Sequence, residues 1–109
     1  MGKGRKHILA LIEQSCGALP YLRGALPVAV REARHPPKCV GDNALAACYT
    51  HSGHIVIWVK PEQTAEAELG CVAHELIHAL AIWQGRPYEH PMIDAEMLAA
   101  EAALGVPIL

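Results

Sequence analysis

The chain has 109 residues, a hydrophobic content of 52% and a formal net charge of −2 at pH 7. This length is enough for one small core, so we treat residues 1–109 as a single domain. The weak net charge and the scattered basic residues do not favour autonomous binding to nucleic acid. No apolar run is long enough to span a membrane, and we expect a cytoplasmic protein.

The N-terminal part of the chain predicts one helix and then the start of a sheet. Residues 6–14, with an extension as far as Cys16, have apolar side chains at helical spacing. Gly17 and Pro20 interrupt this pattern. Residues 28–32 are interpreted as a short first strand that ends before Pro36 and Pro37, so a helix followed by a strand is expected here.

A β-hairpin is predicted in the middle of the chain. Residues 45–50 and 54–59 are rich in β-branched, aromatic and other apolar residues. Between them, residues 51–53 include a glycine that can adopt the positive φ of a tight turn. The sequence therefore predicts a small sheet of three strands.

Two helices are predicted in the C-terminal half. The first covers residues 61–84, with Pro61 at the first helical position and Gly85 placed to end it. Its broad apolar face predicts that it is largely buried. The second helix covers residues 91–104 and ends at Gly105.

The buried helix contains the sequence His74-Glu75-Leu76-Ile77-His78, which has the pattern HExxH. Residues four apart lie on the same face of a helix, so His74 and His78 can bind one metal ion. Imidazole nitrogen is a favoured zinc ligand, and a third protein ligand plus a water would complete an open site. Glu75 can then act as the general base and acid of a hydrolase.

The third metal ligand is expected downstream of this helix. His90 follows a short connection that can bring the chain back over the helix, and imidazole suits zinc. Glu96, in the first half of the second helix, is the alternative and would give two histidines and a carboxylate. We rank His90 before Glu96.

Residues 74–109 resemble the metal-binding half of the SprT-like metallopeptidases. The shared features are HExxH, an apolar helix end with Trp83, a short loop, His90 as third histidine, a further helix and the Leu-Gly-Val-Pro ending. Residues 50–61 also match the apolar pattern of that family's edge strand. Two features depart from the family. Pro91 stands where a glycine usually follows the third histidine, and the Cys-rich zinc ribbon of many members has no counterpart within these 109 residues.

This resemblance implies an α+β, zincin-like fold, in which a small three-stranded sheet packs on the active-site helix with N- and C-terminal helices. It implies a zinc-dependent peptidase that hydrolyses protein substrates, with Zn²⁺ held by His74, His78 and His90 and with Glu75 as the catalytic residue. It also implies a part in cleaving DNA-bound proteins, although the charge of this chain gives that no support.

Three alternatives stay open. The ImmA/IrrE-like peptidases combine HExxH with a later acidic, alanine-rich helix, which residues 94–101 resemble, and this interpretation makes Glu96 the third ligand. A zincin-fold binding or regulatory module with little turnover is the second alternative. The third is a metal-free domain that merely contains the pentapeptide.

Several neighbouring residues have expected roles around the site. Residues 54–59 are predicted to form the edge strand of the cleft, or its neighbour, where an extended peptide adds to the sheet. Tyr88 is a candidate hydrogen-bond donor to a developing oxyanion, with covering the core as its ordinary role. Asp94 and Glu101 are candidates for orienting the imidazoles.

Other reactive or aromatic side chains are expected to have structural roles. His51 and His54 flank the hairpin turn and are expected to be solvent exposed. Trp58 and Trp83 are expected in the core or in the wall of the cleft. Without a CxxC pair, free thiols are expected for all of the cysteines, which are Cys16, Cys39, Cys48 and Cys71.

Overall fold

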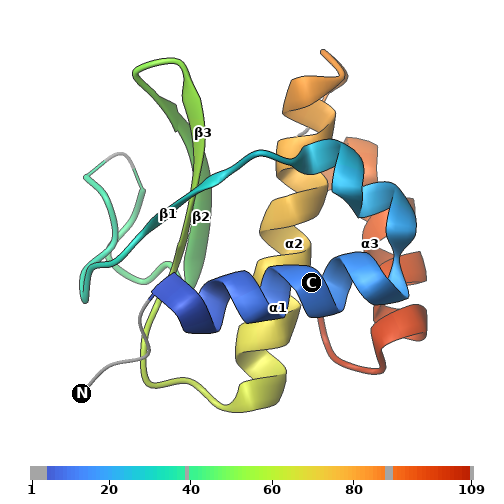
Figure 1. The fold of residues 1–109 in the computed structure, drawn as a ribbon, viewed down its shortest axis with the longest axis horizontal. Coiled ribbons are helices and arrows are strands. Elements are labelled where there is room, and N and C mark those ends of the chain that lie inside the picture. The colour runs from blue at the N-terminus through green and yellow to red at the C-terminus, as the bar shows by residue number, and fades with distance from the viewer. Residues whose placement is uncertain (1–4, 39, 88–89, 109) are drawn as a thin grey trace.

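The computed structural model, shown in Figure 1, describes residues 5–38, 40–87 and 90–108, with only the backbone described for residues 90–92. In chain order the elements are α1 (Arg5–Ala18), the 3-10 helix η1 (Pro20–Ala25), β1 (Ala29–Arg31), β2 (Ala46–His51), β3 (His54–Val59), α2 (Ala65–Trp83) and α3 (His90–Leu104). The predicted α+β class, with a sheet of three strands and helices at both ends, is confirmed for this part of the chain.

The three strands form a mixed sheet in the order β1-β3-β2. β3 pairs in parallel with β1, where Ala29 faces Val56, and antiparallel with β2, where Ala46 faces Val59. Because β3 has a strand on each side, the prediction that residues 54–59 form the edge is wrong, and the prediction that they neighbour the edge is right. β2 is the edge strand on the hairpin side.

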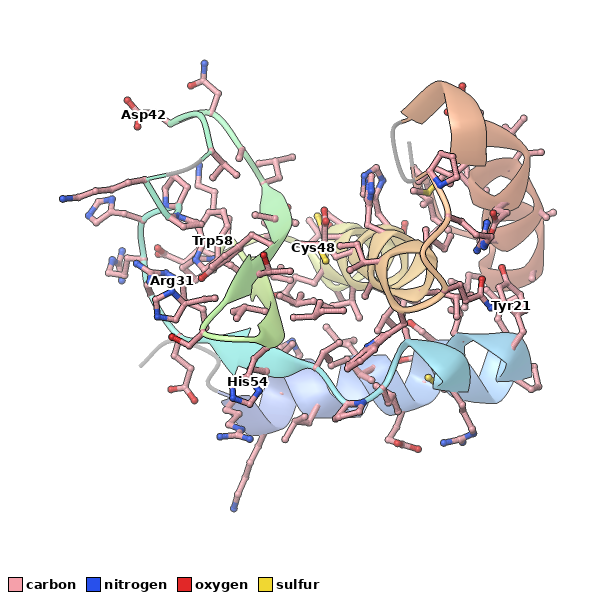
Figure 2. The ribbon with its side chains drawn as sticks, turned by 90° about the horizontal axis from the view of Figure 1, so that it is seen from above. Tyr21, Arg31, Asp42, Cys48, His54 and Trp58 are labelled. Carbon is pink, nitrogen blue, oxygen red and sulfur yellow. The ribbon has the colours of Figure 1, made fainter. Side chains whose placement is uncertain are left out.

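The central position of β3 follows from its composition, since its residues 55–59 are all buried. One face of the sheet joins the core with the helices. On the other face the fully buried Trp58 donates from Nε1 to the carbonyl oxygen of Ala33, at 2.8 Å. Figure 2 shows this difference, with Cys48 directed towards α2 and Trp58 towards the segment that follows β1. A strand covered on both faces carries a continuous apolar run, as this one does.

Helix α2 is the central element of the fold. The sheet lies on one side of it and α3 on the other, while α1 crosses it (Figure 1). Its buried positions include Val72, Ala73, Leu76 and Ile77, each with no exposed surface. The predicted burial of this helix is therefore confirmed, and among the described residues no helix is both long and apolar enough to cross a bilayer.

The ends of α2 differ in how well they were predicted. The helix begins at Ala65 and not at Pro61, because Thr64 is the N-cap and its Oγ1 accepts a hydrogen bond from the Ala67 amide at 3.1 Å. Glu62 has a φ of +67°, which no helical residue can have. At the other end, Gly85 has a φ of +66° and ends the helix as predicted.

Candidate metal centre

The side chains of His74, Glu75 and His78 converge on one point at the surface of α2. The potential ligand atoms of these three residues all lie within 4.8 Å of one another. The Nε2 atoms of the two histidines are 3.2 Å apart, and a carboxylate oxygen of Glu75 lies 3.9 Å from Nε2 of His74. The pairing predicted from the four-residue spacing is thus present in the folded chain.

The separation of the two imidazole nitrogens suits a zinc ion. Two nitrogens bound tetrahedrally at about 2.0–2.1 Å from zinc lie roughly 3.3 Å apart. The observed 3.2 Å between the Nε2 atoms is close to this value, so little movement of either ring is needed to hold the ion. The residues present therefore fit the metal that the HExxH pattern implies.

The first of these histidines is in the tautomer that metal binding requires. Nδ1 of His74 lies 2.9 Å from the backbone carbonyl oxygen of Ile108. A carbonyl oxygen can only accept a hydrogen bond, so Nδ1 carries a proton. In neutral His74 the lone pair is then on Nε2, the atom that faces His78.

Glu75 is in an environment that favours its neutral form. Its side chain is almost completely buried on α2, and this burial raises the pKa of Glu75 to about 8. A carboxyl group whose pKa is near the working pH can both accept and release a proton. This is the behaviour that the HExxH pattern predicts for Glu75.

Two cysteine thiols lie close enough to Glu75 to be affected by its charge. Burial, and then the charge of Glu75, raises the pKa of Cys48 to about 12. Burial is also the largest cause of the raised pKa of Cys71. Because a thiolate is the form that binds metal, these thiols are poor competitors for the histidines near neutral pH. The described cysteines, which exclude Cys39, are all free as expected.

The third ligand is not decided by the described side chains. Helix α3 begins at His90, but the side chain of His90 lies outside the described residues, as do Tyr88 and Glu89, so the prediction for His90 stays a prediction. The rival ligand Glu96 is 2.9 Å from the guanidinium of Arg86 and does not belong to the His74 group. This conformation gives the carboxylate alternative no support.

The two residues proposed to orient the imidazoles are placed differently. Asp94 is exposed on α3. Glu101, on the same helix, accepts a hydrogen bond from the backbone N–H of Ile108 at 2.9 Å. Glu101 is therefore connected to His74 through the backbone of residue 108. Sequence reasoning missed the role of this backbone, although a glycine inside a helix, Gly70, was a signal of close approach by another segment.

A cavity of about 540 Å³ opens beside His74 and Glu75. It lies between the start of β2, the first half of α2 and the end of the chain. Its small or apolar lining residues are Leu45, Ala46, Ala67, Gly70, Cys71, Pro107 and Ile108. The cavity was not predicted, because its walls come from three distant segments of the sequence.

The outer edge of β2 is next to this cavity. The amide of Lys60 donates to the carbonyl oxygen of Leu45 at 2.8 Å, so Leu45 and every second residue after it in β2 direct their backbone groups towards β3. Consequently Ala46, Cys48 and Thr50 direct their backbone groups away from β3. In the described part of the sheet no strand pairs with this edge.

The remaining candidates lie away from the centre. His51 and His54 face one another across the hairpin and are exposed, as expected for turn histidines. Trp83 is 47% exposed at the end of α2, so it is not part of the core, and it lines a second cavity of about 300 Å³ away from the metal centre.

Comparisons with known proteins do not assign this chain to a family. No family model matches it, no curated protein matches its sequence, and no solved structure matches its fold. The resemblance to SprT-like peptidases therefore rests on the motif residues quoted above. Any functional assignment depends on the chemistry of the α2 site.

Proposed function

We propose that this protein is a zinc-dependent peptidase of the HExxH type, with protein or peptide substrates. The observation that carries the proposal is the convergence on α2, where two imidazole Nε2 atoms lie 3.2 Å apart beside the buried carboxyl group of Glu75. His74 and His78 would hold the metal, with His90 as the third ligand. A part in cleaving DNA-bound proteins and a cytoplasmic location rest on the sequence alone.

Glu75 performs the proton transfers in this proposal. Zinc bound by the histidines would polarise the scissile carbonyl and lower the pKa of a bound water to about 7. Glu75 accepts the proton of the attacking water and then donates it to the leaving amine. The burial that raises the pKa of Glu75 to about 8 brings it near the pH at which this exchange takes place.

The neighbouring edge and cavity supply a means of binding a peptide. An extended substrate can add to the outer edge of β2, whose backbone groups at Ala46, Cys48 and Thr50 face away from β3. Alternate side chains of such a strand point to opposite faces. One of them would enter the cavity of about 540 Å³ beside His74, where small and apolar residues favour an apolar side chain.

The direct test combines metal analysis with cleavage of an unfolded protein such as reduced casein. We expect the wild-type protein to bind one zinc ion and to cleave the substrate. We expect Glu75→Gln to keep the zinc and to lose cleavage by about 10²–10⁴-fold, the range for general acid–base groups. Glu13→Gln is the control, because Glu13 is an exposed acid on α1 and does not line the cavity beside His74.

Two results would contradict the proposal. If the wild-type protein binds no zinc, the convergence on α2 is not a metal site. If zinc binds but cleavage is absent or is the same in Glu75→Gln, the enzyme assignment fails. The second result favours the alternative of a binding or regulatory module with a structural metal.

A further inference from the structure

Residues 105–108 return from α3 and lie against α2 beside the candidate metal centre. Gly105 ends α3 with a φ of +72°, and the side chains of Val106 and Ile108 are buried. The backbones come close together at Gly70, where a Cβ atom would overlap the carbonyl oxygen of Pro107. The segment can occupy this position only because residue 70 is glycine.

Two hydrogen bonds attach this segment to side chains of α3 and α2. The backbone N–H of Ile108 donates to Oε1 of Glu101 at 2.9 Å. The carbonyl oxygen of the same residue accepts from Nδ1 of His74, also at 2.9 Å. Glu101 on α3 and His74 on α2 are therefore connected through one residue of the chain end.

We infer that Glu101 is a positioning residue for His74 and acts through the backbone of Ile108. The carboxylate of Glu101 holds residue 108 in place, and the carbonyl of residue 108 keeps the proton of His74 on Nδ1. This leaves Nε2 as the ligand atom and restricts rotation of the ring. The inference rests on the proposed function, since it takes His74 as a zinc ligand.

A purely structural role for the segment predicts something different. Buried Val106 and Ile108 would then act by packing alone. Removal of the hydrogen-bond acceptor at residue 101 would leave the tautomer of His74 unchanged. Glutamine at position 101 retains an oxygen that can accept from the same N–H, whereas alanine does not. The pair of variants therefore separates the hydrogen bond from the packing.

The first test uses the zinc-free wild-type protein and needs no activity. Long-range ¹H–¹⁵N correlation NMR at pH 8 reports which imidazole nitrogen carries the proton, and the His74 signal is assigned by its loss in His74→Ala. We expect the Nδ1–H tautomer in the wild type and in Glu101→Gln, and a mixture of tautomers in Glu101→Ala. An Nε2–H tautomer in the wild type overturns the inference.

The second test measures zinc affinity by competition with a chelator. Loss of a group that orients a metal-binding histidine typically weakens metal binding by about 10–100-fold. We expect a loss in this range for Glu101→Ala and near-wild-type affinity for Glu101→Gln. Asp94→Ala is the control, because Asp94 is an exposed acid of the same helix. If Glu101→Ala binds zinc as tightly as Asp94→Ala does, the inference is wrong.

A variant on the other helix covers the case in which Glu101→Ala does not fold. Gly70→Ala places a methyl group against the Pro107 carbonyl, whereas Gly17→Ala in α1 meets no atom within 4 Å. We expect Gly70→Ala, and not Gly17→Ala, to weaken zinc binding and to disturb the His74 tautomer. Unchanged zinc affinity and tautomer in folded Gly70→Ala overturn the inference, while a wild type without zinc affinity overturns the proposed function instead.

Discussion

Among the described residues, one pair of neighbouring histidines lies on the hairpin and another on α2, and the α2 pair has the surroundings of a metal site. His51 and His54 face each other across the hairpin turn and are exposed. His74 and His78 lie one turn apart on α2, beside a buried carboxyl group and a backbone acceptor. Proximity is common to both pairs, so it does not by itself define a site.

The difference lies in what fixes each imidazole. A turn histidine in water keeps its rotamer freedom and its full hydration, and both must be given up when a metal binds. The α2 pair is held by a helix that is buried on most sides, and Ile108 fixes the ring of His74. The α2 histidines are thus held in place before a metal ion binds, and this distinguishes them from the hairpin pair.

The largest expected effect is on zinc affinity, when one histidine of each pair is replaced by alanine. Structural zinc sites contribute about 10–16 kcal/mol from four ligands, so one ligand corresponds to roughly 3 kcal/mol, or about 100-fold in affinity. We expect His78→Ala to weaken zinc binding by at least that factor in a chelator competition. His54→Ala is the matched control and is expected to bind zinc as the wild type does. Equal losses in both variants would remove the distinction between the pairs.

The two candidates for the third ligand, His90 and Glu96, are expected to differ in their effect on zinc affinity. We expect His90→Ala to weaken zinc binding by about 100-fold, the loss estimated above for one ligand, because it leaves two imidazoles to hold the ion. Glu96→Ala breaks a partly exposed pair with Arg86 and is expected to have little effect on zinc binding or on stability. The same competition assay measures both variants. The reverse order of effects would identify the carboxylate as the ligand.

Glu75 is also expected to affect how the stability of the metal-free protein depends on pH. The pKa of Glu75 is about 8 in the folded chain against 4.5 for the ordinary carboxyl group, so the folded state holds this proton more tightly. Its stabilising contribution is complete below pH 4.5 and is lost as the pH rises towards 8. Each tenfold difference in proton affinity between the folded and unfolded chain corresponds to about 1.4 kcal/mol of stability.

We therefore expect the Tm of the metal-free protein to fall between pH 5 and pH 8 by more in the wild type than in Glu75→Gln. The comparison at each pH cancels the titration of groups remote from Glu75, which both proteins share. A difference of about 10 °C or more is expected, because the change in pKa corresponds to several kcal/mol and about 1 kcal/mol shifts the Tm of a domain this size by roughly 4–8 °C. Parallel Tm curves for the two proteins would show that Glu75 does not titrate as described.

The sequence predicted the elements that local signals specify. The hairpin turn, the buried helix and the pairing of His74 with His78 follow from glycine placement and helical spacing, and all are present. The start of α2 was misplaced because a proline was preferred to Thr64, whose side chain caps the helix. Pro61 and Thr64 are both of residue types that commonly begin a helix, and the hydrogen bond from the Ala67 amide makes Thr64 the N-cap.

Features that depend on long-range packing were not predicted. The parallel pairing of β1 with β3 makes β3 central, although the continuous apolar run of β3 was a signal for this position. The bond from His74 to the carbonyl of Ile108 joins residues 34 positions apart, and no periodicity reports it. The cavity likewise arises only when three segments meet.

In the proposed function, the two imidazoles of α2 bind a metal ion beside Glu75. A crystal structure of the zinc-loaded protein, with anomalous diffraction recorded at the zinc edge, tests it most directly. We expect one peak about 2.0–2.1 Å from Nε2 of His74 and of His78, with the Glu75 carboxylate beyond ligand distance. A peak at His51 and His54, or none at α2, would contradict it.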